Sequence, residues 1–160
     1  MLYGKILYHS EFGYFTIISD DYYIRKIQFG KQSLPDSAVW VESHPLLKLA
    51  EDQMIEYFSG KRSAFSLPLA PDGTPFQLAV WKVLQQIPYG ETISYGTLAG
   101  LLDRPKAARA VGGACHQNPI VIVIPCHRVI GANGNLTGFG GGIQLKHALL
   151  DLELRNTEND

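Results

Sequence analysis

This chain has few cysteines, little net charge and no long apolar run. Its 160 residues contain two cysteines, Cys115 and Cys126, too few for the disulfide framework of a small secreted domain. No stretch approaches the roughly 20 consecutive apolar residues that span a bilayer. Residues 1–14 also lack the basic leader and apolar run of a signal peptide. We therefore expect a globular, cytoplasmic protein with no membrane partner, whose thiols stay reduced.

Charge is distributed unevenly along the chain. The formal net charge is −1, which excludes a uniformly basic protein, but residues 76–150 carry 6 Lys and Arg against 2 Asp and Glu. A surplus of this size also occurs on proteins that touch no DNA. The middle stretch is nevertheless the candidate nucleic-acid face.

The first part of the chain reads as a small sheet with one helix. An antiparallel meander is predicted by three segments rich in Ile, Tyr and Phe: Lys5–His9, Gly13–Ser19 and Tyr22–Phe29. After a loop over Gly30–Ser43, apolar residues at helical spacing predict a helix from Pro45 to the stop at Gly60. The proline-containing stretch Leu67–Gly73 is the expected boundary between domains 1–73 and 74–160.

Helices dominate the start of the second part. Thr74 and Pro75 predict the start of an amphipathic helix that ends before Pro88. Two short helices are expected next, over Ser94–Leu102 and Pro105–Cys115. Because a tight turn joins them, they have the outline of a helix-turn-helix.

The remaining segments predict a strand, a wing and a final helix. Ile120–Ile124 has the continuous β-branched pattern of a buried strand. An Asn-Gly turn makes Val129–Leu136 a candidate β wing. The glycine-rich loop Gly138–Gly142 leads into an amphipathic helix over Ile143–Leu154. The expected fold class is α+β, with a small antiparallel sheet and helix first and a winged helix-turn-helix second.

Cys126 is the candidate nucleophile because it lies between a predicted buried strand and His127. A thiol reacts as its thiolate, and an adjacent imidazole can take the proton directly or through water. The alternative is a buried, inert cysteine, which is the commoner role. Two adjacent Cys-His pairs rarely converge on one ion, and CxxC and HxxxH spacings are missing, so no metal site is expected.

Three further residues are ambiguous by themselves. Arg109 is the one arginine in a helix of alanines and glycines, which suits either close approach to a narrow DNA groove or a packed core helix. Tyr95, at a helix start, would usually be a packing residue. Glu153, in the last helix, would usually be a solvated charge.

Taken together, these segments resemble the O6-alkylguanine-DNA alkyltransferase family over about residues 74–153. The similarity is carried by residues 124–129 (IPCHRV), 88–95 (PYGETISY), 109–114 (RAVGGA), 118–119 (NP) and 138–141 (GFGG). The first 70 residues share only the layout of the family's ribonuclease-H-like domain. They contain no cysteine for the structural zinc that some members carry.

The resemblance implies direct-reversal repair of double-stranded DNA that bears O6-alkylguanine, chiefly O6-methylguanine. The helix-turn-helix would enter the minor groove, with Ala110, Gly112 and Gly113 allowing close approach. Arg109 would fill the gap left by the flipped nucleotide, whose unstacking costs a few kcal/mol. The alkyl group would pass irreversibly to Cys126 in one turnover, without a cofactor.

The resemblance also gives roles around the thiol. Glu153 would orient His127, which would take the Cys126 proton through a water, and Asn118 would hold the cysteine segment in place.

Other residues would bind the base. The Tyr95 hydroxyl and the Gly140 amide would donate toward O6, while carbonyls of Cys126 and Val129 would accept from the guanine amino group. Phe139 and Gly141 would complete the pocket; Phe139 replaces a tyrosine of some members, and Gly140 a serine.

Three other functions compete with repair. They are a binder of alkylated DNA that lacks an acceptor thiol, a methyl-responsive DNA-binding sensor, and a cysteine hydrolase that turns over repeatedly. The acceptor motif at Cys126 argues against the first, and the lack of an additional cysteine-bearing regulatory segment against the second. We expect a monomer in solution, with clustering on DNA left open.

Overall fold

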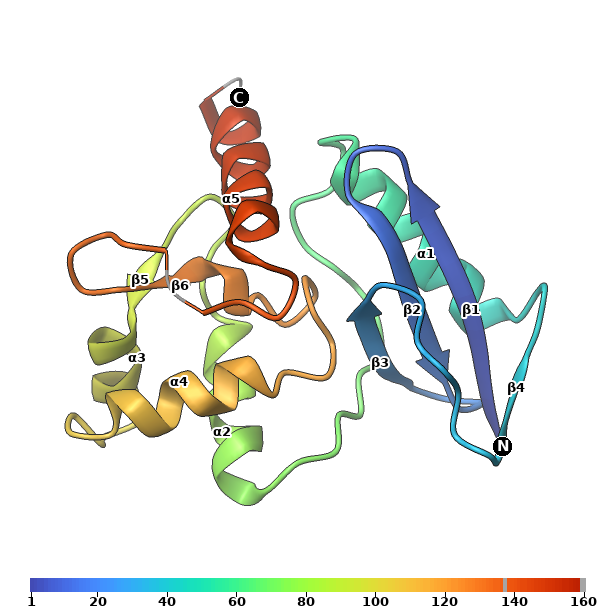
Figure 1. The fold of residues 1–160 in the computed structure, drawn as a ribbon, viewed down its shortest axis with the longest axis horizontal. Helices are drawn as coiled ribbons and strands as arrows, with labels where there is room; N and C mark the ends of the chain where they lie inside the picture. The colour runs from blue at the N-terminus through green and yellow to red at the C-terminus, as the bar shows by residue number, and fades with distance from the viewer. Residues whose placement is uncertain (137, 159–160) are drawn as a thin grey trace. The chain divides into compact units, whose positions relative to one another are not determined.

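The computed structural model describes residues 1–136 and 138–158 (Figure 1). Two compact units divide the chain. The first contains Met1–Asp72 and the short segment Pro119–Val121; the second contains Gly73–Asn118 and the chain from Ile122 onward. The chain thus changes unit close to the predicted boundary, and then contributes three later residues to the first unit.

A four-stranded sheet forms the first unit. β1 (Leu2–His9), β2 (Gly13–Ser19) and β3 (Ile24–Phe29) make the predicted antiparallel meander. The predicted loop Gly30–Ser43 also contains a short strand, β4 (Ala38–Trp40), which pairs parallel with β1 and gives the order β3-β2-β1-β4. Sequence patterns miss β4 because three residues show no periodicity and its partner is distant in the chain.

Helix α1 (Pro45–Phe58) covers one face of this sheet (Figure 1). It begins as predicted, with His44 accepting the Leu46 amide at the N-terminus, and Gly60 follows its end with φ +75°. Phe58 packs on Phe12 with ring centroids 4.7 Å apart, so aromatic contacts form much of this core.

Helices organise the second unit. A capping box of Thr74 and Gln77 starts α2 (Pro75–Leu84), and Ser94 caps α3 (Tyr95–Leu101). α4 (Ala108–His116) begins three residues later than predicted, after a turn in which Asp103 has φ +58°. α3 and α4 pack together as the predicted helix-turn-helix. α2 packs on α4, where Trp81 Nε1 donates to Ala114 O at 2.8 Å.

The predicted strand Ile120–Ile124 is wrong. Ile120 makes an isolated bridge to Ile27 within the first unit, and Ile122 has φ +73° in a turn. Such a φ is a rare conformation for a β-branched residue. The apolar run did predict burial correctly, since every residue of Ile120–Ile124 except Val123 is buried. Burial, however, does not require an extended backbone.

The wing differs from the predicted hairpin. β6 (Val129–Ile130) pairs parallel with β5 (Ile93–Ser94), the strand that precedes α3. The predicted Asn-Gly turn is present, with Gly131 N donating to Asn135 O at 2.8 Å. The chain after this turn forms no strand in the described residues.

The last helix, α5 (Ile143–Glu158), extends four residues beyond the predicted end at Leu154. It therefore includes most of the acidic carboxyl-terminal stretch. Among the described residues, no helix combines the length and hydrophobicity needed to cross a membrane.

Candidate active site

Cys126 opens a short 3-10 helix, η1 (Cys126–Arg128), directly after Pro125. The residue is 6% exposed. The Asn118 side-chain amide donates to Ile124 O at 2.7 Å and to Cys126 Sγ at 3.1 Å. One amide group therefore holds both the backbone before the cysteine and the sulfur itself.

Both thiols of the chain are buried, and burial raises their pKa values. The pKa of Cys115 rises to about 12. Burial also raises the pKa of Cys126, but the Asn118 hydrogen bond and the nearby Lys146 charge act in the opposite direction. Cys126 thus has stabilising contacts for a thiolate, yet it needs a base to become one.

His127 is a fully buried candidate for that base. Its Nε2 lies 2.6 Å from Glu153 Oε2, and both side chains are 0% exposed. An ionised carboxylate only accepts hydrogen bonds, so Nε2 carries the proton and Nδ1 keeps a lone pair. In the described part of the chain Nδ1 is buried and has no hydrogen-bond partner.

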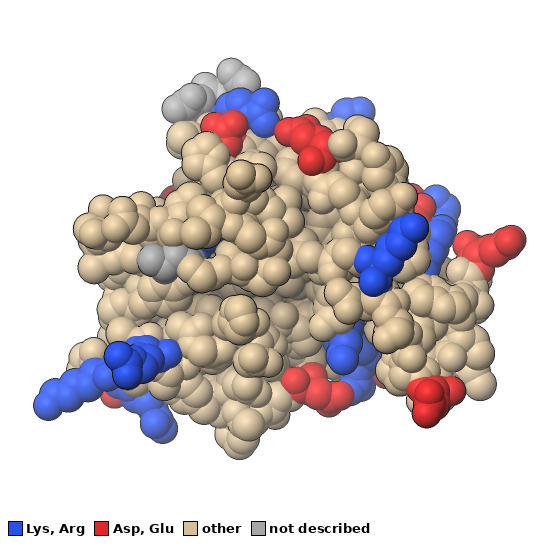
Figure 2. All heavy atoms as spheres, viewed as in Figure 1, with Lys and Arg blue, Asp and Glu red and all other residues tan. Residues whose placement is uncertain are grey.

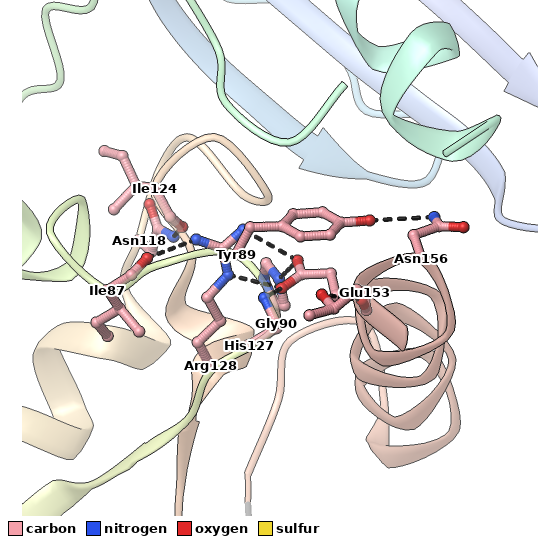
Figure 3. Close-up of polar contacts among 10 residues, drawn as sticks. Ile87, Tyr89, Gly90, Asn118, Ile124, His127, Arg128, Glu153 and Asn156 are labelled. Carbon is pink, nitrogen blue, oxygen red and sulfur yellow. Dashed lines mark hydrogen bonds and ion pairs between the residues drawn. The ribbon is translucent and has the colours of Figure 1, made fainter. Parts of the chain in front are cut away.

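Glu153 is the centre of a buried polar network (Figure 3). Arg128 donates to it from Nε at 2.8 Å and from Nη2 at 3.1 Å, and the Gly90 amide donates at 3.1 Å. A third Arg128 bond, from Nη1 to Ile87 O, measures 2.7 Å. This network joins η1 and α5 to the segment that follows α2.

The network sets the charges of its members. Burial alone would raise the pKa of Glu153, but the His127 and Arg128 contacts outweigh it and lower the pKa to about 2. Burial lowers the pKa of His127 despite the Glu153 bond. The ion pair is therefore between Glu153 and Arg128, and the imidazole is neutral near pH 7.

Lys146 is a second buried cation beside the thiol. Its side chain is fully buried on α5, seven residues before Glu153, so both lie on one helix face. Its Nζ is 5.8 Å from the Tyr95 ring centroid and 5.9 Å from that of Phe139. Sequence reasoning gave Lys146 no role in the site and counted Arg128 only as part of the IPCHRV motif, because charged residues are expected at the surface.

The predicted base-binding residues lie in two other segments. Val129 is buried in β6, and its amide donates to the Cys126 carbonyl. In the glycine-rich loop, the Phe139 carbonyl accepts from the Gly142 amide at 3.0 Å. Gly140 is exposed and Gly141 is half-buried there.

The predicted DNA-binding residues divide along α4. Arg109, Ala110 and Gly113 are exposed, whereas Gly112 is half-buried beside Tyr95. A side-chain carbon at Gly112 would lie 3.7 Å from Tyr95 Cδ1, so this glycine lies against the ring.

Cations gather at the turn between α3 and α4. Arg104 and Lys106 are exposed there, five and three residues before the exposed Arg109, and Asp103 is an acidic neighbour. Figure 2 shows Lys and Arg side chains projecting from this end of the helix pair. With three cations and one acid, this cluster accounts for two of the four surplus positive charges in residues 76–150.

The two Cys-His pairs, Cys115-His116 and Cys126-His127, lie in the same unit. The described residues contain no group of three or more His, Cys, Asp or Glu side chains that could hold an ion. The two Cys-His pairs thus do not form a described metal cluster.

Comparisons with known proteins agree along the whole chain. Residues 75–155 match the family described as 6-O-methylguanine DNA methyltransferase, DNA binding domain, and residues 1–71 match the ribonuclease-like domain of the same family.

Individual relatives cover nearly all of the chain. A methylated-DNA–protein-cysteine methyltransferase of Methanosarcina acetivorans is 45% identical over 151 residues, which cover 92% of this chain and 96% of the relative. One from Haemophilus influenzae is 44% identical over 149 residues, covering 91% and 83%. The crystal structure of Mycobacterium tuberculosis OGT in complex with DNA has a TM-score of 0.87 at 41% identity, covering 97% of this chain and 93% of that one. The chain therefore belongs to the 6-O-methylguanine DNA methyltransferase family.

Proposed function

We propose that the protein restores O6-alkylguanine in double-stranded DNA by moving the alkyl group to Sγ of Cys126, once per molecule. The family accounts for the class of reaction, repair of DNA by alkyl transfer to a protein cysteine. The choice of Cys126 rests on one observation. Its neighbour His127 is neutral, with Nε2 bonded to Glu153 and Nδ1 still able to accept a proton.

The first step is deprotonation of the thiol. His127 Nδ1 takes the Cys126 proton through a water, and the resulting imidazolium is stabilised by its bond to Glu153. Arg128 and the Gly90 amide hold that carboxylate in place, while Asn118 donates to the sulfur. The base and the nucleophile are thus positioned before substrate arrives.

The second step is an in-line displacement at the alkyl carbon. The S–C bond forms as the bond from carbon to O6 breaks, and guanine leaves with negative charge. The Tyr95 hydroxyl and the Gly140 amide donate toward this charge. The Cys126 carbonyl already accepts from Val129 N, and its second lone pair is available to the guanine amino group. Phe139 and Gly141 bound the base.

DNA is held by α3 and α4, the helix-turn-helix of the domain 74–160. Arg109, Ala110 and Gly113 form its exposed face, which we assign to the minor groove, with Arg109 replacing the flipped nucleotide. Arg104 and Lys106 would contact phosphates, so affinity should fall as salt rises. We infer that the protein is cytoplasmic and is a monomer in solution.

Repair is tested with a labelled duplex that contains one O6-methylguanine. We expect conversion to guanine with a ceiling of one equivalent per protein, because the thioether product is a poor leaving group. Mass spectrometry should find one added methyl group on the Cys126 peptide. Several turnovers per molecule would indicate a hydrolase instead.

The second cysteine provides a matched control. Cys126→Ala should abolish transfer and retain duplex binding, whereas Cys115→Ala should keep both. Methyl transfer that persists in Cys126→Ala, or a methyl group found on Cys115, would refute the assignment of the acceptor.

A further inference from the structure

A fully buried lysine needs an explanation, because moving an ammonium out of water costs several kcal/mol unless its surroundings compensate. Lys146 is 0% exposed on α5 and takes no part in the proton transfer described above. Its burial lowers its pKa, and the two nearby thiols act to raise it again. Its surroundings indicate what the charge is for.

Three segments meet at the Lys146 ammonium. Tyr95 comes from the start of α3, Phe139 comes from the glycine-rich loop, and Lys146 comes from the first turn of α5. Both rings lie within the distance of about 6 Å at which a cation is attracted to an aromatic face. One cation thus contacts both aromatic residues assigned to the base pocket.

Helix α5, which carries the ammonium, packs on η1, which carries Cys126. The Lys146 charge acts to lower the pKa values of both Cys126 and Cys115, against the rise that burial causes. The other ionisable groups around Cys126 add little net charge. Arg128 is paired with Glu153, His127 is neutral, and Cys115 is protonated near pH 7. Lys146 therefore supplies positive potential at the sulfur.

We propose that Lys146 is a positioning residue of the alkyl-transfer pocket, whose buried ammonium stabilises the Cys126 thiolate and holds the Tyr95 and Phe139 rings in place. This rests on the function proposed above. It adds a charge to the reaction without adding a chemical step.

The cation acts at two stages. Before transfer it favours ionisation of Cys126, because opposite charges attract strongly in a buried site. During transfer the negative charge moves from sulfur to guanine. A cation against the Tyr95 ring makes its hydroxyl a stronger donor to the leaving base. Holding Phe139 orders the loop that carries the Gly140 amide.

The test compares Lys146→Met, which removes the charge but keeps a similar length, with Lys146→Arg, which keeps the charge. Lys82→Met removes an exposed lysine of α2 and is the matched control. All are made in a Cys115→Ala background, so that iodoacetamide reports on Cys126 alone. The rate of thiol modification is measured against pH without DNA, and single-turnover transfer is measured with the lesion duplex.

We expect the modification profile of Lys146→Met to move to higher pH by about one unit, with a rate near pH 7 about tenfold lower. Lys146→Arg should stay within about threefold of the parent, and Lys82→Met should match it. Transfer should slow more than thiol modification does in Lys146→Met, because the ring contacts are lost as well. An unchanged profile would overturn the proposal even if transfer slowed, because a purely structural role leaves the thiol pKa unmoved.

The native chain provides a second measurement in case Lys146→Met does not fold. The NMR shift of the Lys146 Cε carbon should show a titration step at the pH where Cys126 ionises, and Cys126→Ala should remove that step. A Lys146 signal that ignores Cys126 would also overturn the proposal. Failure of the wild-type protein to repair O6-methylguanine would refute the function but not the coupling between these two groups.

Discussion

The two compact units bury different kinds of polar group. In the first unit, the buried polar side chains of the described residues are the neutral Thr16, Ser19 and Gln53. In the second, they are Asn118 and four residues with ionisable groups: His127, Arg128, Lys146 and Glu153. Every buried His, Lys, Arg, Asp or Glu side chain of the described residues therefore belongs to the unit that holds Cys126.

This difference separates the groups that stabilise the fold from the groups that serve the reaction. Apolar and aromatic burial, as around Phe15 and Phe58, stabilises the first unit at about 25 cal/mol per Å². A buried ion pair often stabilises a protein no more than apolar residues of similar volume would. The charges of the second unit are better explained by the reaction at Cys126 than by its fold.

Removing the charge at the centre of the second unit should have the largest effect. Glu153→Gln leaves Arg128 buried with an unpaired charge, and should lower the free energy of unfolding by about 3–5 kcal/mol. Glu51→Gln, which removes the half-buried partner of Lys5 in the first unit, should cost about 1 kcal/mol or less. Urea unfolding measures the free energy of unfolding of both variants. Equal decreases in the two would contradict the proposed difference between the units.

Acid should expose the same contrast in the unmodified protein. The pKa of Glu153 is about 2 when folded, below its ordinary value of 4.5, so its stabilisation is complete above pH 4.5 and is lost as pH falls toward 2. The loss should approach about 3 kcal/mol. The folded-state pKa of His127 is also lowered, which adds a loss that begins as pH falls below 6.5.

Urea unfolding at several pH values measures this window. Between pH 4.5 and 3, the slope of stability against pH should be positive in the parent and markedly smaller in Glu153→Gln. A slope unchanged by Glu153→Gln would place the acid-sensitive groups elsewhere.

Local signals explain how far the sequence could be interpreted. The starts of α1 and α2 were predictable because caps and prolines act within a few residues, as with Thr74 and Gln77. The strand predicted over Ile120–Ile124 failed because a run of apolar residues reports burial and not backbone angle. The parallel pairs β1–β4 and β5–β6 join segments distant in the chain, and no local pattern specifies such pairing.

The site shows the same limit. Cys126 and His127 are adjacent, so a motif could indicate them. The bonds of Arg128 go to Glu153, 25 residues away, and to Ile87, 41 residues away. Only the fold brings these partners together. The sequence offered one indication of this cluster, the seven-residue spacing that puts Lys146 and Glu153 on the same helix face. The same spacing is equally typical of charged residues on a solvent-exposed helix face.

Buried neutral amides allow a closer comparison of the units. Gln53 accepts from Ser66 N at 2.9 Å, and Asn118 donates to Ile124 O. Gln53→Leu and Asn118→Leu should each cost about 1 kcal/mol, because each removes side-chain hydrogen bonds, while Ile124 O keeps its bond from Cys126 N and Ser66 is exposed. Only Asn118→Leu should also raise the pKa of Cys126 and slow its reaction with iodoacetamide. If both variants slow the thiol equally, the effect is general loosening and not the lost bond to sulfur.

The smallest change in stability should accompany a large change in function. Arg109 is exposed on α4, so Arg109→Ala should alter the free energy of unfolding by less than about 0.5 kcal/mol, as should Lys61→Ala in the first unit. The thiol of Arg109→Ala should react with iodoacetamide at the parent rate, because Arg109 is not among the groups that shift the pKa of Cys126. Transfer from a lesion duplex should nevertheless fall at least tenfold, while transfer from the free base O6-methylguanine should not change. Equal losses on duplex and free base would mean that Arg109 acts on the pocket and not on the extruded nucleotide, because only the duplex has to be opened.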